Sequence, residues 1–279
     1  MKLLISLFVI VSSLVLFTIT KSQRQKVSMG ISEKEPTISK GRDTAAVPVI
    51  VELFTSEGCS SCPPADEVLA KLVKTQPVQG AEIIALGEHV DYWNQLGWID
   101  PFSSSQFSNR QSEYADAFGR DGVYTPQMIV DGHDEFAGGN MGKAREAIAR
   151  AVQTPKANIE LVASPGPNRN EVNVSIQVRD VPRQSSADAA DVLLAVTENN
   201  LSSEVPRGEN AGRSLRHIAV TRRLMVLGQI KAGTNSFEAK PTVNLANDWI
   251  KGNIHAVVLV QEHASRRVLG AALVSLSGK

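Results

Sequence analysis

The sequence predicts two folded units in series, an α/β unit at residues 47–155 and an all-β unit at residues 156–279. In the first unit, short runs rich in β-branched residues alternate with amphipathic helical patterns, which is typical of α/β proteins. In the second unit, apolar and polar residues alternate strictly, as at residues 172–178, and loops with Pro, Gly and Ser separate the runs. The length of 279 residues leaves room for two cores, at about 150 residues per domain.

Composition and charge exclude several classes of protein. The chain carries 29 Lys and Arg against 29 Asp and Glu, which argues against a protein that coats nucleic acid. Two cysteines in 279 residues exclude a scaffold held together by many disulfides. Residues 1–26 contain four basic residues and no acidic one, so the remainder of the chain is mildly acidic.

The N-terminal residues have the composition of a targeting segment. Residues 3–20 are uncharged and mainly aliphatic, which predicts a signal peptide or a membrane anchor at residues 1–20. Their number is close to the minimum of about 17 that spans a bilayer, and no small-x-small cleavage site follows, so both interpretations stay open. We therefore expect a periplasmic or secreted protein, either released or tethered to the inner membrane by residues 3–20. Residues 21–46 lack aromatic residues and predict a flexible linker.

The two cysteines form a single Cys-x-x-Cys unit, Cys59 and Cys62, between a predicted strand and a predicted helix. Pro63 and Pro64 suit the first positions of a helix, where the missing N–H groups are not needed. Both sulfurs would then lie at a helix N-terminus, where free N–H groups favour the thiolate and lower the pKa of a cysteine thiol. We expect Cys59 to be the exposed attacking thiolate and Cys62 the resolving thiol, with a reversible disulfide between them.

The order of the predicted elements in the first unit is β-α-β-α-β-β-α, with Cys-x-x-Cys at the first strand-to-helix turn. After the first strand and helix, the remaining elements are expected at residues 83–86, 107–118, 127–130, 135–137 and 140–152. This order resembles the thioredoxin fold. Pro126 stands where proteins of that fold carry a cis-proline beside the dithiol, so we expect a cis Thr125–Pro126 bond that presents backbone groups to an incoming peptide.

Three sequence blocks carry a more specific resemblance. Residues 51–66 read VELFTSEGCSSCPPAD, residues 89–98 contain HVDYW and then GW, and residues 123–127 read VYTPQ. Together they resemble the secreted bacterial family catalogued as domain of unknown function 1223, over residues 47–279. The resemblance implies export and an α/β thioredoxin-like domain followed by an all-β sandwich-like domain, and the family has no settled substrate.

Glu52 is a candidate proton acceptor. It stands seven residues before Cys59, about where thioredoxin-like proteins bury an acid beneath the dithiol, and it could take the proton from Cys62. The alternative is a salt-bridged strand residue, and the sequence does not separate the two interpretations.

The segment that follows the second strand supplies further candidates. His89 could stabilise the thiolate or relay a proton, or it could simply be held by Asp91 at the end of a strand. Tyr92 and Trp93 fit either a peptide-docking lip over the dithiol or the core of a lid. Thr125 is the third residue that we expect to contact a substrate.

The leading hypothesis is a thiol–disulfide oxidoreductase that acts on protein thiols and disulfides together with a redox partner protein. A disulfide that closes so short a loop constrains the unfolded chain little, so a purely structural role is less favoured. The alternatives are a non-catalytic envelope binding protein and a copper-handling accessory. No Met-rich run, second Cys-x-x-Cys or His-x3-His spacing completes a metal site, so we expect no metal and no cofactor. The second unit has no catalytic spacing, and its basic residues lack the aromatic partners of a nucleic-acid surface.

Overall fold

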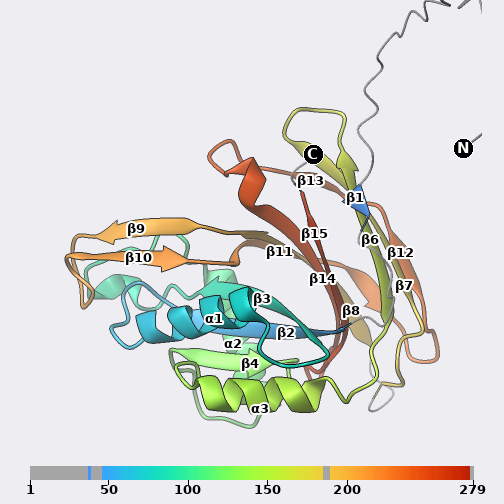
Figure 1. The fold of residues 1–279 in the computed structure, drawn as a ribbon, viewed down its shortest axis with the longest axis horizontal. Helices are drawn as coiled ribbons and strands as arrows, with labels where there is room; N and C mark the ends of the chain where they lie inside the picture. Colours follow the sequence, from blue (N-terminus) through green and yellow to red (C-terminus); the bar gives the residue numbers. More distant parts are fainter. Residues whose placement is uncertain (1–36, 39–45, 185–188, 277–279) are drawn as a thin grey trace, which may run out of the picture. The chain divides into compact units, whose positions relative to one another are not determined.

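The structure of the protein is a computed structural model that describes residues 37–38, 46–184 and 189–276. These residues belong to one compact unit (Figure 1). The predicted signal or anchor at residues 1–20 lies outside the described residues, as does the predicted linker apart from residues 37, 38 and 46. Among the described helices, none has the length and hydropathy needed to cross a membrane.

The elements of the first half follow the order that the sequence predicts. They are β2 (Val47–Thr55), α1 (Pro63–Thr75), β3 (Ala81–His89), α2 (Ser105–Ala117), β4 (Gln127–Val130), β5 (Asp134–Ala137) and α3 (Met141–Ala151), with a short 3-10 helix at Asn94–Leu96. Side chains cap two of the helices: Ser104 accepts a hydrogen bond from the Gln106 N–H at α2, and Asn140 accepts one from Lys143 at α3.

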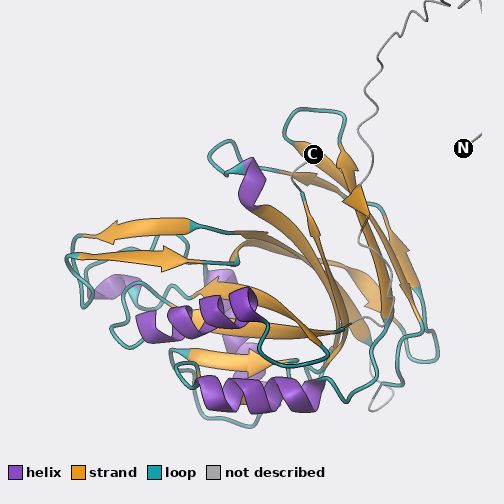
Figure 2. Cartoon of the chain, viewed as in Figure 1, coloured by secondary structure: helices purple, strands orange, loops and turns teal. Residues whose placement is uncertain are grey.

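The second half is built from strands (Figure 2). They are β6 (Asn158–Pro165), β7 (Glu171–Arg179), β8 (Ala190–Glu198), β9 (Leu201–Val205), β10 (Arg213–His217), β11 (Val220–Ile230), β12 (Phe237–Ala239), β13 (Thr242–Asn244), β14 (Ile254–Glu262) and β15 (Val268–Ser275). A short β1 (Thr37–Ile38) pairs with β6, and a 3-10 turn at Lys251–Asn253 precedes β14. β9 and β10 pair antiparallel and form a hairpin.

The predicted fold class, a thioredoxin-like domain followed by a separate sandwich-like domain, is wrong. Within the described residues, one mixed sheet of eight strands runs through both predicted units, in the order β15-β14-β8-β11-β3-β2-β4-β5. Only three α-helices accompany it in this part of the chain, which is mainly β-structure. A five-stranded sheet of β1, β6, β7, β12 and β13 and the two-stranded β9–β10 hairpin complete the architecture.

The junction between the two halves of the large sheet lies at Gly87. β3 and β11 run parallel and share one register pair, Val220 with Gly87, while the Gly87 N–H donates to the carbonyl oxygen of Ala219 at 2.7 Å. A Cβ at position 87 would lie 3.2 Å from the carbonyl oxygen of Ile218 and 3.3 Å from that of Ala219. The missing side chain therefore permits the close approach that joins the two halves.

Side chains on the two faces of the sheet form separate cores. On one face of β2 and β3, Val51, Leu53 and their neighbours pack against α1 and α3. On the opposite face, Ile50 and Leu86 pack with Phe107 of α2 and with residues of β8, β14 and β15. This second core crosses the predicted boundary at residues 155 and 156, so the two halves are packed together.

Candidate functional site

The Cys-x-x-Cys unit occupies the turn between β2 and α1, as the sequence predicts. Cys59 and Cys62 form a disulfide with 5.4 Å between their Cα atoms, and Cys62 is the N-cap of α1. Both cysteines have 0% of their surface exposed. The prediction of an exposed Cys59 is therefore wrong for the oxidised protein.

The tip of the β9–β10 hairpin, residues 206–212, covers the disulfide turn. The buried side-chain amide of Asn210 donates to the carbonyl oxygens of Glu57 at 2.8 Å and Cys59 at 2.9 Å. Next to it, a carboxylate oxygen of Glu209 accepts from the N–H of Ser60 at 3.0 Å. These contacts join segments about 150 positions apart in the chain, which sequence periodicity does not reveal.

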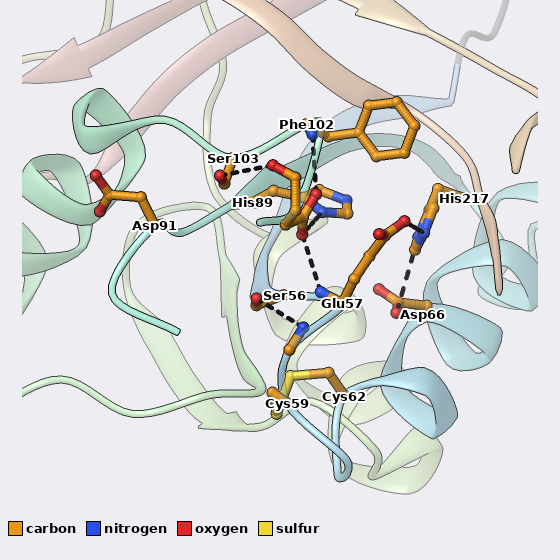
Figure 3. Close-up of polar contacts among 12 residues, drawn as sticks. Ser56, Glu57, Cys59, Cys62, Asp66, His89, Asp91, Phe102, Ser103 and His217 are labelled. Carbon is orange, nitrogen blue, oxygen red and sulfur yellow. Dashed lines mark hydrogen bonds and ion pairs between the residues drawn. A yellow bond between two sulfur atoms is a disulfide. The ribbon is translucent and has the colours of Figure 1, made fainter. Parts of the chain in front are cut away.

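Behind the disulfide lies a buried cluster of carboxylates and histidines, which we call the acid–histidine cluster: Glu57, Asp66, His89, Asp100 and His217 (Figure 3). Nδ1 of His89 lies 2.7 Å from Oδ2 of Asp100, and Nε2 of His217 lies 3.0 Å from Oε1 of Glu57. The two imidazole rings meet edge to face, with centroids 4.8 Å apart. His89 is thus held by Asp100, and the predicted partner Asp91 instead accepts a hydrogen bond from Ser108.

Glu57 and Asp100 have their oxygens engaged. Oε2 of Glu57 accepts from the indole N–H of Trp98 at 2.7 Å, and Oδ2 of Asp100 accepts from the backbone N–H of Glu57 at 2.9 Å. Burial alone would raise the pKa of Asp100, but the neighbouring His89 and the N–H groups that donate to the carboxylate lower it below the usual value. Asp100 is therefore a carboxylate at neutral pH.

Asp66 differs from the other two acids of the cluster. Its Oδ2 lies 4.0 Å from Nδ1 of His217, and its side chain is 13% exposed. Burial raises the pKa of Asp66 to about 7; His217 and a hydrogen bond with Thr55 oppose the rise, and the negative charges of Asp100 and Glu57 add to it. A cavity of about 370 Å³ opens beside this carboxyl group; its lining consists of Pro63, Asp66, Glu67, Arg213, Ser214, Leu215 and Arg216.

Glu52 lies in a different environment from the one expected for an acid beneath the dithiol. Glu52 lies between Ile50 and Phe54 on one face of β2, and this face packs against α2. Helix α1 packs on the opposite face. Its carboxylate pairs with Nε of Arg110 at 2.7 Å and accepts from the hydroxyl of Tyr114. The alternative interpretation, a salt-bridged strand residue, is the one that matches these contacts.

A second buried acid, Glu88 of β3, shares the cation of Glu52. Its Oε1 lies 3.4 Å from Nε of Arg110. Burial raises the pKa of Glu88 well above its usual value, and the negative charge of Glu52 is the second cause of the rise. Because the raised pKa favours the protonated form of Glu88, the group is a buried Glu52–Arg110 ion pair with a second acid beside it, between β2, β3 and α2.

The predicted substrate contacts lie together on one side of the disulfide turn. The indole N–H of Trp93 donates to the hydroxyl of Thr125 at 2.8 Å, and Cβ of Trp93 lies 3.0 Å from the place where a Cβ on Gly58 would stand. The Thr125–Pro126 bond is cis, which confirms the prediction from sequence. The half-buried Tyr92 hydroxyl belongs to the same group, because it donates to Gln111 and also forms a hydrogen bond with Thr125.

The sequence prediction did not include Asp100, Glu209 and four other residues of the site, Glu57, Asp66, Asn210 and His217. Glu57 stands two positions before Cys59, and Asp66 stands four positions after Cys62. Their proximity to the motif was the signal that could have found them. His217 and Asn210 come from the β9–β10 hairpin, and only the pairing of distant strands brings them to the disulfide.

Solved structures are similar to the chain over most of its length. The crystal structure of protein AGR_C_4864 from Agrobacterium tumefaciens is 29% identical, with 84% of this chain and 96% of that chain covered and a TM-score of 0.58. HBP35 of Porphyromonas gingivalis is 17% identical, with 85% and 77% covered and a TM-score of 0.62, a likeness of fold alone. No curated protein matches the chain.

A family model, described as protein of unknown function (DUF1223), matches residues 50–261. The match covers well over half of the chain, includes both cysteines and confirms the family resemblance seen in the sequence. The chain belongs to the DUF1223 family.

Proposed function

We propose that the protein is a thiol–disulfide oxidoreductase that exchanges the Cys59–Cys62 disulfide with thiols of protein substrates. The observation that carries the proposal is a disulfide across two intervening residues, at the N-cap of α1 and beside a buried acid–histidine cluster. A bridge that closes so short a loop adds little stability, so exchange chemistry explains its presence better than stapling. The helix N-terminus favours the thiolate that the reaction must release.

The reaction balances without a cofactor. A substrate thiolate attacks Sγ of Cys59, the bond to Cys62 breaks, and the electron pair passes to Sγ of Cys62. A second substrate thiolate then attacks the substrate sulfur of the mixed disulfide and releases Cys59 as a thiolate. Two electrons pass from the substrate dithiol to the protein, and the substrate leaves as a disulfide; a redox partner protein returns the dithiol to the disulfide.

Access to the sulfurs requires movement of the hairpin tip. Both cysteines are fully buried, and Asn210 and Glu209 hold the tip on the disulfide turn. In the proposed cycle the tip moves away to admit the substrate, and Trp93 and Thr125 form the adjoining wall of the opened site.

We propose an exported protein, because an oxidising compartment sustains a protein disulfide and residues 3–20 have the composition of a targeting segment. Cell fractionation of the full chain, with thiols blocked at lysis, tests this proposal. A soluble periplasmic or secreted form would indicate a cleaved signal peptide, and a form in the inner membrane would indicate a retained anchor. Recovery in the cytoplasm with free thiols would contradict it.

Disulfide exchange with insulin or a model dithiol peptide tests the function. We expect exchange by the wild-type protein and none by Cys59→Ser, with Ser112→Ala on the exposed side of α2 as the control. Exchange retained in Cys59→Ser would overturn the assignment of the attacked sulfur. A folded wild-type protein that exchanges with neither substrate would overturn the enzyme proposal.

The burial of both sulfurs favours a second candidate, a non-catalytic envelope binding protein in which the disulfide fixes the β2–α1 turn. Under this alternative, Cys59→Ser would keep partner binding, and the wild-type disulfide would resist reduction until the protein unfolds. Pull-down from the same cell envelope with wild type and Cys59→Ser separates the candidates, since a trapped mixed disulfide needs Cys59 and a non-covalent complex does not.

A further inference from the structure

We propose that Asp66, backed by His217, gives a proton to Cys62 when the disulfide opens and takes it back when the disulfide forms. The inference deepens the proposed function and rests on the same disulfide. It replaces the sequence-based expectation that Glu52 serves this purpose, because Glu52 lies on the other face of β2 in an ion pair with Arg110.

The position of Asp66 on α1 carries the proposal. Asp66 follows Cys62 by four residues, and its backbone N–H donates to the Cys62 carbonyl oxygen at 3.1 Å. Residues four apart at a helix start share one face, so the side chains of Asp66 and of the N-cap cysteine lie on the same face of α1. Figure 3 shows Asp66 between His217 and the disulfide.

The contacts of the cluster leave Asp66 as the acid that can exchange a proton. Glu57 has one oxygen on His217 and the other on Trp98, and Asp100 is held as a carboxylate by His89. Nδ1 of His217 is buried, points toward Asp66 at 4.0 Å and has no hydrogen-bond partner in the described structure. A half-protonated carboxyl group at neutral pH fits this place, since the pKa of Asp66 is raised to about 7 by burial.

Charged groups from all the surrounding elements face Asp66. These groups are His217, Arg213 and Arg216 of β10, Glu57 of the disulfide turn, His89 at the end of β3, Asp100 of the segment after β3, and Glu67 of α1 itself. The cavity of about 370 Å³ lies on this side, so Asp66 can exchange protons with water while the sulfurs stay buried.

The proton balance is complete. When a thiolate attacks Cys59 and the sulfur–sulfur bond breaks, the electron pair leaves with Cys62, and the protonated Asp66 transfers its proton to that sulfur. Asp66 becomes a carboxylate and regains a proton from water through the cavity. In the reverse direction, the carboxylate takes the proton from the Cys62 thiol, and the thiolate that results attacks the mixed disulfide at Cys59.

The first test is the pH dependence of disulfide reduction by dithiothreitol, with the rate divided by the concentration of reagent thiolate. For the wild type, we expect the normalised rate to fall about tenfold as pH rises through about 7, because the acid form of Asp66 is lost. Asp66→Asn should give a slow and flat profile, and Asp66→Glu should restore the fall. Asp116→Asn, on the exposed side of α2, is the matched control and should follow the wild type.

The second test does not depend on enzymatic activity. Infrared spectra of the oxidised protein should show one carboxylic acid band that is present at pH 6, is lost as the pH rises through about 7, and is missing in Asp66→Asn. An inflection near pH 7 that persists in Asp66→Asn, or a carboxylic acid band that survives the substitution, would overturn the assignment. Failure of the insulin assay, together with the expected dithiothreitol profile and infrared band, would overturn the proposed function and leave the proton transfer intact.

Discussion

Removal of the Asn210 side chain should expose the disulfide. Asn210 donates two hydrogen bonds from a fully buried amide, to the carbonyl oxygens of Glu57 and Cys59. At about 1 kcal/mol for each bond, Asn210→Ala weakens closure of the hairpin tip by about 2 kcal/mol. Since 1.4 kcal/mol corresponds to a factor of ten, the population with an open tip should rise about 30-fold.

The assay is the rate of disulfide reduction by dithiothreitol at fixed pH, followed by alkylation and mass spectrometry. If the tip opens and closes faster than the reagent reacts, the rate follows the open population, so Asn210→Ala should react about 30-fold faster than wild type. Ser202→Ala, on an exposed position of β9, is the matched control and should react like the wild type. A rate in Asn210→Ala within threefold of the wild type would refute the idea that the tip controls access.

Global unfolding could also expose the disulfide, and urea separates the two routes. Local opening of the tip exposes little surface, so low urea concentrations should hardly change the reduction rate. A rate that rises as steeply with urea as the unfolding equilibrium would contradict the local mechanism.

Three further predictions concern the stability of the oxidised protein. The pKa of Asp66 rises from 3.8 to about 7 on folding, so between these pH values the folded state binds more protons than the unfolded state. The free energy of unfolding should therefore fall as pH rises from about 4 to 7, by at most about 4 kcal/mol. Urea titrations at several pH values should show this slope in the wild type and its loss in Asp66→Asn; an unchanged slope would contradict it. Arg110→Ala leaves Glu52 and Glu88 buried without their cation and should cost about 3–5 kcal/mol in urea unfolding at pH 7; a loss below 1 kcal/mol would show that the ion pair is dispensable. Gly87→Ala places a Cβ against backbone oxygens at the β3–β11 junction and should lower the free energy of unfolding by about 1–3 kcal/mol. The control Gly122→Ala, with open space around it, should change the unfolding midpoint little. Equal effects of the two substitutions would contradict the close approach of β3 and β11 at Gly87.

The sequence predicts local structure well in this chain because the signals are local. The prolines after Cys62 mark the start of α1, Asn140 caps α3, and the alternation at residues 172–178 lies within β7. The disulfide and the cis bond at Pro126 were predicted from a motif and a resemblance, and both are present.

The arrangement of the halves could not be predicted in this way. Strand patterns show which residues are buried but not which strands pair, so the contact between Gly87 and Val220 leaves no periodic signal. The prediction of Glu52 beneath the dithiol rested on its spacing to Cys59 in thioredoxin-like proteins, whereas alternation along β2 places it on the face opposite α1. His217 and Asn210 of the β9–β10 hairpin also reach the site only through contacts between segments that are far apart in the chain.

A redox titration of the native protein in glutathione buffers tests the central claim most directly. If Cys59 and Cys62 form an exchange site, the oxidised fraction should follow a single two-electron transition with a midpoint between about −270 and −120 mV, the range of known thiol–disulfide oxidoreductases. The variant Asn210→Ala should approach equilibrium faster than the wild type. A disulfide that stays oxidised below about −300 mV, or that is reduced only when the protein unfolds, would contradict the account and identify a structural bridge.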